Sequence, residues 1–251
     1  MPQQHILITG MSGLIGSAVR RHLQDEYKLR ALNRSEVPGV ECHRGDIADL
    51  EAILPAFEGI DTVVHLAAHS GDASWEVLLP HNVIGTYNVF EAARRSGVGR
   101  VVFASSGSSV SGRELVEPYR SLVGEGDGDR PDTWEMVTHE STVWPSGLYA
   151  CSKVWGEALA RHYADTADMS ALCLRIGAVN REDRPLQARH FSVWCSQRDI
   201  AQMVGRCIAA PPELRFDIFY VTSNNRWSYR DLEHAREVLG YEPMDHAEDH
   251  R

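Results

Sequence analysis

TGMSGLIG, residues 9–16, stands between a short apolar segment at residues 5–9 and a stretch of helical periodicity at residues 12–24. A glycine-rich turn between a strand and a helix lets backbone N–H groups and the helix N-terminus approach a pyrophosphate. Glycines also end strands for purely steric reasons, but the order of strand, glycines and helix favours phosphate binding. The sequence therefore predicts a dinucleotide site formed by Gly10, Ser12, Gly13, Leu14, Ile15 and Gly16.

The same alternation of apolar runs and helical stretches continues along the chain. Strands are predicted at residues 5–9, 29–32, 62–66, 101–104 and 171–174, and helices at residues 12–24, 49–57, 83–95 and 149–163. This pattern predicts an α/β fold with a Rossmann-like, doubly wound parallel sheet and helices on both faces. Because such sheets bind ligands at the carboxyl ends of their strands, we expect the site at that edge.

The length of 251 residues fits a single domain. Residues 1–175 are predicted to form an NAD(P)-binding core, and residues 176–251 a small substrate-binding region that closes over the substrate. Within that region, residues 199–210 and 229–239 have the periodicity of helices. Residues 112–146 are rich in Gly, Pro, Asp and Glu, which predicts a long excursion or lid between a strand and a helix.

Composition and charge exclude several classes of protein. The net charge of −10 and the lack of a long basic run disfavour nucleic acid as a partner. The N-terminal MPQQHILITG has no basic segment followed by a long apolar stretch, so we expect neither signal peptide nor membrane anchor, and a cytoplasmic protein. Five scattered cysteines without a C-x-x-C pair, and twelve histidines without an H-E-x-x-H motif, argue against disulfides and against a metal site.

The second predicted strand ends in Leu32-Asn33-Arg34-Ser35, where NAD-specific proteins usually place an acidic residue against the adenosine ribose. Asn33 and Arg34 are therefore candidate cofactor residues without an acid. The guanidinium of Arg34 suits the 2′-phosphate of NADP, whereas a solvated Arg34 would leave NAD bound through neutral contacts. The expected cofactor is NADP or NAD, with NADP favoured. Farther on, Asp46, beside Ile47, is placed to accept a hydrogen bond from the adenine amine.

Tyr149-Ala150-Cys151-Ser152-Lys153 begins a predicted helix, which puts the phenol and the ammonium on one face, one turn apart. A tyrosine that acts as a base near neutrality needs a pKa well below about 10. A nearby lysine and a positively charged nicotinamide lower that pKa. Such a pair alone is common on helix surfaces, but together with the glycine turn it predicts Tyr149 as the catalytic base and Lys153 as its partner.

The strand at residues 101–104 runs into Ser105-Ser106-Gly107-Ser108-Ser109. Several hydroxyls therefore lie at the carboxyl end of a strand, where the sites of such sheets assemble. A polar turn would have the same composition, since serine and glycine favour turns for local reasons. In the presence of the other motifs, we expect one of these serines to position the reacting oxygen.

Together these motifs resemble those of the extended short-chain dehydrogenase/reductases, also called the NAD-dependent epimerase/dehydratase family. TGMSGLIG is similar to the family's T-G-x-x-G-x-x-G, GDIAD to its adenine-side motif, HLAA to its strand-four motif, NVIGTYNVFEAAR to the helix that follows, and YACSK to Y-x-x-x-K. The resemblance covers nearly the whole chain and is more specific for fold and cofactor than for substrate. It implies further cofactor contacts from Leu66, Ala67, Ala68, Asn82 and Ile176.

The resemblance also implies roles for the catalytic candidates. Ser106 would contact the substrate oxygen, Tyr149 would exchange a proton with it, and Lys153 would hold the nicotinamide ribose and lower the tyrosine pKa. Alignment from the preceding strand selects Ser106, whereas alignment backward from Val110-Ser111-Gly112 leaves Ser108 as an alternative. Two helices, predicted at residues 83–95 and 149–163, commonly pair across a dimer axis in this family, so we expect a homodimer.

Within the family, the C-terminal third resembles uronate dehydrogenases and related sugar dehydrogenases, through LRIG at residues 174–177, Arg189 ahead of Trp194, and SQRD at residues 196–199. This likeness implies that Arg189 binds an anionic group of the substrate, although a surface arginine is the alternative. It also implies that the sugar is contacted by Ser70, Ser106, Gly107, Ser108 and Tyr149. Gly107-Ser108 replaces Asn-His and Ala178 replaces a serine, which removes two contacts to a uronate.

These features predict hydride transfer between a nicotinamide cofactor and a sugar or sugar-acid hydroxyl, in either direction. The expected partner is a small-molecule substrate, with an anionic sugar as one option. Three alternatives stay open: a cofactor-retaining sugar epimerase, a carbonyl reductase of a non-sugar substrate, and a non-catalytic NAD(P)-binding regulator. No acidic pair follows Ser106, which counts against dehydration, and the presence of Tyr149 with Lys153 counts against the regulator.

Overall fold

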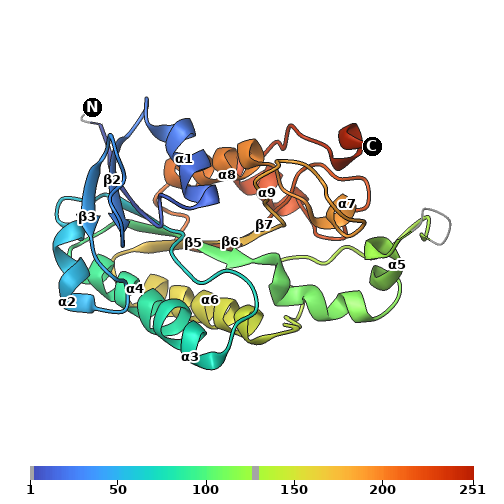
Figure 1. Cartoon of the computed structure of the whole chain (residues 1–251), viewed down its shortest axis with the longest axis horizontal. Helices are drawn as coiled ribbons and strands as arrows, with labels where there is room; N and C mark the ends of the chain where they lie inside the picture. The colour runs from blue at the N-terminus through green and yellow to red at the C-terminus, as the bar shows by residue number, and fades with distance from the viewer. Residues whose placement is uncertain (1–2, 126–129) are drawn as a thin grey trace.

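A computed structural model describes residues 3–125 and 130–251. Within them, seven parallel strands form one sheet in the order β3-β2-β1-β4-β5-β6-β7 (Figure 1). The strands are β1 (His5–Thr9), β2 (Lys28–Asn33), β3 (Glu41–Arg44), β4 (Thr62–His65), β5 (Arg100–Ser106), β6 (Ser170–Ile176) and β7 (Phe216–Val221). The strand order reverses between β1 and β4, which leaves a crevice at their carboxyl ends. The predicted Rossmann-like, doubly wound sheet is thus confirmed.

Helices cover both faces of the sheet. One face carries α1 (Leu14–Leu23), α8 (Gln197–Ala209) and α9 (Glu233–Leu239), and the other α2 (Leu50–Ile53), α4 (Gly85–Arg95) and α6 (Leu148–Thr166), as Figure 1 shows. The shorter elements are η1 (Leu54–Phe57), α3 (Trp75–Leu78), the π-helix η2 (Leu79–Ile84), η3 (Gly107–Leu115), α5 (Tyr119–Val123), α7 (His190–Val193) and η4 (Ala247–His250). None of the helices in the described part of the chain is both long and apolar enough to cross a membrane.

Two apolar cores hold these layers together, one on each face. Successive side chains of a strand point to opposite faces, so Ile6 and Ile8 of β1 pack into the core beneath α1 and α8, while Leu7 packs into the core above α4 and α6. All three side chains are fully buried. The sheet therefore presents both faces as rigid, covered surfaces, and only its edges and strand ends are open for ligands.

The C-terminal region does more than cover the substrate, and the expectation for residues 176–251 needs correction. They contribute β7, which pairs with β6 from Ala171↔Phe216 to Ile176↔Val221, and α8, which packs against α1. The sequence predicted no strand there, because an edge strand only half buried at its start lacks the continuous apolar run of a central strand. The sheet and its covering helices thus extend past residue 176.

The excursion between β5 and α6 is ordered where the structure describes it. It contains η3 and α5, and backbone bonds tie it down: Gly112 N–H donates to Trp144 O (2.8 Å), and Val137 N–H donates to Tyr229 O (2.7 Å). Residues 126–129, part of the Gly- and Asp-rich stretch, lie outside the described residues. Because Val137 pairs with Arg230, the helix predicted to begin at residue 229 begins only at Glu233.

Candidate active site

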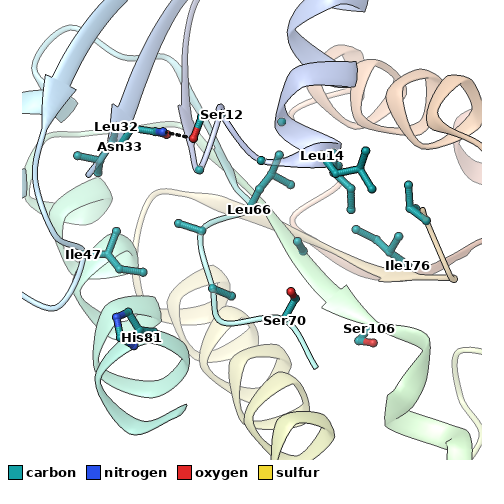
Figure 2. Close-up of a pocket in the computed structure, with 18 of the residues that line it drawn as sticks. Ser12, Leu14, Leu32, Asn33, Ile47, Leu66, Ser70, His81, Ser106 and Ile176 are labelled. Atoms are coloured by element: carbon teal, nitrogen blue, oxygen red, sulfur yellow. Dashed lines mark hydrogen bonds between the residues drawn. The ribbon is translucent and has the colours of Figure 1, made fainter. Parts of the chain in front are cut away.

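A cavity of about 550 Å³ lies at the carboxyl ends of the strands. Figure 2 shows Asn33 at one end of this cavity and Ser106 at the other, with Leu66 and Ser70 between them. The sequence-predicted residues that line it are Gly10, Ser12, Gly13, Leu14, Ile15, Gly16, Asn33, Arg34, Asp46, Ile47, Leu66, Ala67, Ala68, Ser70, Ser106, Tyr149, Lys153 and Ile176. Segments far apart in the sequence thus converge on one elongated space, as the carboxyl ends of parallel strands require.

The glycine turn after β1 leaves backbone close to the cavity. Gly10 has a φ of +71°, and a Cβ there would lie 3.0 Å from the backbone of Ala67. At Gly16 a Cβ would lie 2.5 Å from the carbonyl oxygen of Gly10. Gly13 precedes α1, and its side-chain-free N-cap leaves the first N–H groups of the helix uncapped by any side chain. These groups, at the positive end of α1, suit a pyrophosphate.

The end of β2 provides the residues for the adenosine half of a dinucleotide. Asn33 is buried, donates from Nδ2 to Ser12 Oγ (2.6 Å), and leaves its buried Oδ1 without a hydrogen-bond partner in the described structure. An orphaned buried acceptor at this point fits a ribose hydroxyl donor. Arg34 is exposed, and with Arg44, Gly45 and Asp46 it lines an adjoining space of about 470 Å³.

Sequence reasoning missed Arg44. Parallel pairing of β2 with β3 aligns Asn33 with Arg44, so two guanidinium groups lie beside this adjoining space. The available signal was the G-D-I motif, since a strand leading to Gly45 must end next to Arg34 in a doubly wound sheet. The same limited view of strand ends missed the lining residues Leu32, Ser35, Gly45, His81, Ala104, Ser105, Gly177, Ala178 and Val179.

The loop after β4 is fixed by a buried threonine. Thr9 Oγ1 accepts from the N–H groups of Leu66 (3.1 Å) and Ala67 (3.0 Å) and lies 2.8 Å from Nδ1 of His65. Burial, with the charge of Lys153, lowers the pKa of His65 to about 3, so this imidazole is neutral. The HLAA motif therefore supplies a rigid, uncharged wall rather than a titrating group.

Tyr149 and Lys153 begin α6 and both face the cavity. Lys153 Nζ donates to Ala104 O (2.8 Å) and lies 5.7 Å from the Tyr149 ring centroid. Burial lowers the pKa of Lys153 to about 8. Burial raises the pKa of Tyr149, against the smaller effect of its hydrogen bond with Ser106. The chain's own groups thus do not produce the lowered tyrosine pKa that the sequence led us to expect.

Ser106 and Ser108 form one hydrogen-bonded unit, but only Ser106 lines the cavity. Ser106 Oγ accepts from Ser108 Oγ (2.8 Å) and from Ser108 N–H (3.1 Å). Gly107, between them, does not line the cavity, and a Cβ there would lie 2.1 Å from Nη1 of Arg230. The geometry therefore places Ser106 toward Tyr149 and turns residues 107 and 108 away from the open space.

Two other predicted contacts lie outside the cavity. Asn82, a predicted cofactor residue, is buried and binds the loop after β4: its Oδ1 accepts from His69 N–H (2.8 Å) and its Nδ2 donates to His69 O (3.0 Å). It acts through the position of that loop, since burial keeps it from the open space. Arg189, the predicted anion-binding residue, instead donates from Nε and Nη2 to the two carboxylate oxygens of Glu114 (2.6 and 2.8 Å).

A possible metal cluster lies away from this cavity. His139, Asp217 and His234 bring their ligand atoms within 4.8 Å of one another, and none of the three lines the cavity. The rings of His139 and His234 are stacked at 3.7 Å, and His234 Nε2 lies 2.9 Å from Asp217 Oδ1. The cluster therefore gives no reason to place a metal among the candidate catalytic residues.

Comparison with known proteins places this geometry in context. Residues 6–182 match the model of the NAD dependent epimerase/dehydratase family. The chain is 32% identical to the NAD-dependent glucose-6-phosphate dehydrogenase of Haloferax volcanii, over 97% of this chain and 94% of that protein. It is 31% identical to the L-arabinose 1-dehydrogenase (NAD(P)(+)) of the same organism, over 96% and 97%. The crystal structure of uronate dehydrogenase from Agrobacterium tumefaciens superposes with a TM-score of 0.83 at 32% identity, covering 99% of this chain and 87% of that one.

Proposed function

The chain belongs to the NAD-dependent epimerase/dehydratase family, and from this premise we propose that it is an NAD(P)-dependent oxidoreductase acting on a sugar or sugar-acid hydroxyl. One observation carries the proposal: Ser106, Tyr149 and Lys153 line the same cavity as the glycine turn of residues 9–16. The relatives described above are sugar and sugar-acid dehydrogenases, which supports the same chemistry.

Each of the three side chains has a task that its position suits. Ser106, which is hydrogen-bonded to Tyr149, holds the substrate oxygen beside the phenol. Tyr149 accepts the hydroxyl proton when the carbon is oxidised and returns it in the reverse direction. The bound nicotinamide supplies the hydride acceptor. Because Lys153 is buried and tied to Ala104 O, its charge is fixed near the phenol and the nicotinamide ribose.

We propose NADP, with NAD as the alternative, for the dinucleotide. Gly10, Gly13 and Gly16 let backbone approach the pyrophosphate, and Arg34 with Arg44 provides two cations where the 2′-phosphate would lie. Replacing either arginine by alanine is expected to raise the KM for NADP+ about tenfold and to change the KM for NAD+ little. Equal effects on both cofactors would contradict the preference.

We also infer a homodimer in the cytoplasm. Large apolar side chains are exposed along α3, η2, α4 and the start of α6, namely Trp75, Val77, Ile84, Tyr87 and Leu148. Such a patch supports self-association through the α4 and α6 face. All five cysteines are free thiols, which fits a reducing compartment. A monomeric mass in solution would contradict the dimer.

An absorbance screen at the nicotinamide band tests the function directly. NAD+ and NADP+ are each incubated with neutral aldoses, uronates and sugar phosphates, and net formation of NAD(P)H is expected with at least one sugar. Tyr149→Phe is expected to lower kcat by about 10²–10⁴-fold, whereas Tyr27→Phe, at a tyrosine that does not line the cavity, serves as the matched control. A cofactor-retaining epimerase would form no net NAD(P)H, and full turnover by Tyr149→Phe would refute the catalytic assignment.

A further inference from the structure

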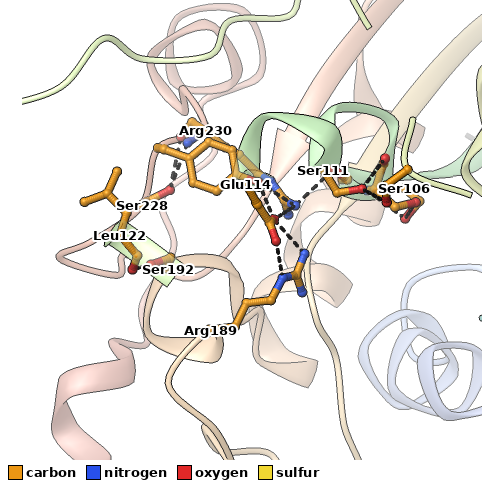
Figure 3. A network of polar contacts seen from close by, with 12 residues as sticks. Ser106, Ser111, Glu114, Leu122, Arg189, Ser192, Ser228 and Arg230 are labelled. Atoms are coloured by element: carbon orange, nitrogen blue, oxygen red, sulfur yellow. Dashed lines mark hydrogen bonds and ion pairs between the residues drawn. The ribbon is translucent and has the colours of Figure 1, made fainter. Parts of the chain in front are cut away.

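Glu114 connects two walls of the substrate end of the cavity. It lies in η3, which begins at Gly107 directly after Ser106, so one side of its cluster adjoins the candidate catalytic serine. Its partner Arg189 caps α7, whose last residue Val193 accepts from the N–H of the cavity-lining Ala178 (2.7 Å). Figure 3 shows Glu114 between Arg189 and Arg230, with Ser106 at the far end of η3.

The contact between Glu114 and Arg189 is a bidentate ion pair. Nε and Nη2 of Arg189 donate to the two carboxylate oxygens at 2.6 and 2.8 Å, and the hydroxyl of Tyr229 donates to Oε1 at 2.6 Å. The Glu114 side chain is only 12% exposed and that of Arg189 34%. Burial disfavours the carboxylate, but the bonds and charge of Arg189, with the charge of Arg230, hold the pKa of Glu114 below its usual value. The carboxylate is therefore charged at neutral pH.

Arg230 adds a second cation that the cavity cannot reach. Its side chain is 2% exposed, and Nη2 donates to Gly107 O (3.0 Å) and to the Tyr229 hydroxyl (3.3 Å) and lies 3.9 Å from Glu114 Oε1. Its guanidinium fills the space beside Gly107 that a side chain at that position would occupy. The charge that remains accessible in this cluster is thus the pair of Arg189 and Glu114, which sums to zero.

The residues around Tyr149 at this end of the cavity are also uncharged. Ser70, Ser106, Ala178 and Val179 line it, and the ammonium of Lys153 is engaged by Ala104 O. A carboxylate or phosphate is bound most strongly by the two parallel N–H groups of a guanidinium edge. At Arg189 the Nε and Nη2 edge is already taken by Glu114, so an anionic substrate group would meet a carboxylate there.

We propose that Glu114 is a specificity-determining residue: by occupying Arg189, it makes the enzyme select an uncharged aldose over a sugar that carries a carboxylate or a phosphate. The inference rests on the proposed sugar dehydrogenase function and narrows its substrate class. Glu114 lies in the excursion between β5 and α6, so this segment sets the substrate by supplying one charge.

The test compares three sugars of one stereochemistry in the full-length protein: glucose, glucuronate and glucose 6-phosphate, with a galactose series as the alternative. The wild-type protein is expected to use the neutral sugar with a kcat/KM at least about tenfold above that of either anion. Glu114→Gln removes the charge that blocks Arg189, and the ratio of anionic to neutral kcat/KM is expected to rise about tenfold. Glu117→Gln, at an exposed glutamate that binds Arg120, is the matched control and is expected to leave the ratio unchanged.

A double variant keeps the test sharp if the single variant folds poorly. Glu114→Gln combined with Arg189→Met removes both charges and is expected to keep the wild-type preference, because no guanidinium is set free. A wild-type preference for an anionic sugar, or the same ratio in Glu114→Gln as in the wild type, would overturn the inference while leaving a sugar dehydrogenase. Absence of NAD(P)H formation with every sugar would overturn the proposed function, and the inference with it.

Discussion

The two ends of the cavity are built by different means. At the dinucleotide end, backbone groups carry the geometry: Gly10 N–H donates to Leu32 O (3.0 Å), and Thr9 holds the N–H groups of Leu66 and Ala67. At the substrate wall, side chains from three distant segments hold one another through charge, in the pairing of Glu114 with Arg189 and of Arg230 with Gly107 O. Few atoms at the first end can move without disturbing the sheet, whereas single substitutions can rewrite the second.

This difference explains how one scaffold can serve several sugars. The dinucleotide end depends on φ angles and backbone contacts that only glycine permits, as at Gly10. The substrate wall depends on ion pairs whose members can be exchanged without changing the path of the chain. Substitutions in the first region should therefore disturb cofactor binding, and those in the second should change substrate preference.

The largest effect is expected at Gly16. Its Cβ would lie 2.5 Å from Gly10 O and 2.6 Å from Met11 Cα, both backbone atoms that cannot move aside. Gly16→Ala is expected to weaken binding of NAD+ and NADP+ by about 100-fold. Titration of the purified protein with each dinucleotide, followed by calorimetry, measures the loss.

Gly205 provides the matched control for that substitution. It lies within α8, and the nearest atom to an added Cβ is a side-chain carbon of Leu23 at 3.5 Å, an ordinary contact. Gly205→Ala is expected to stabilise the fold by about 0.5–1 kcal/mol and to leave dinucleotide binding intact. If Gly16→Ala bound both cofactors normally, the dinucleotide end would be no more rigid than the rest of the molecule.

Most of the dinucleotide end could be predicted from sequence because its signals are local. The glycine turn, the acid-free end of β2 and the Tyr149-Lys153 pair each occupy a few consecutive residues at a strand end or helix start. The doubly wound topology then brings them together without further information. What failed there depended on pairing between strands: Arg44 became visible only through its register with Asn33.

The substrate wall could not be predicted in the same way. Glu114, Arg189 and Arg230 are separated by at least about 40 residues, and no periodicity or spacing relates them. Arg189 was expected to face the substrate, but a carboxylate from the excursion binds it instead. Arg230 fell within a predicted helix, whereas its backbone pairs with Val137. Gly107 departs from the uronate dehydrogenase pattern in a way the structure explains, because Arg230 fills its side-chain space.

A thermodynamic cycle at that contact sharpens the comparison. Gly107→Ala places a Cβ 2.1 Å from Arg230 Nη1 and is expected to destabilise the fold by about 1–3 kcal/mol. In an Arg230→Ala background the clash is absent, so the two changes are expected to couple by at least about 1 kcal/mol. Chemical denaturation of the four proteins measures the coupling.

The control for the cycle is Arg226, whose guanidinium stacks on Trp227. Gly107→Ala and Arg226→Ala are expected to be additive within about 0.5 kcal/mol. Additivity of Gly107→Ala with Arg230→Ala as well would show that the substrate wall absorbs a new side chain freely. The contrast between a side-chain-built wall and a backbone-built cofactor end would then lose its physical basis.

The smallest effect is a pH dependence at Lys153, where the two ends meet. Its folded-state pKa is lowered to about 8 by burial, whereas an unfolded lysine titrates near 10.5. Between these values the unfolded chain binds the extra proton, so this group makes the fold more stable as pH rises. The unfolding free energy of the wild type minus that of Lys153→Met is therefore expected to increase by about 1–2 kcal/mol from pH 7.5 to 9.5. A flat or falling difference would mean that Ala104 O and the nearby groups already stabilise the ammonium, and that burial at the centre of the cavity does not set its charge.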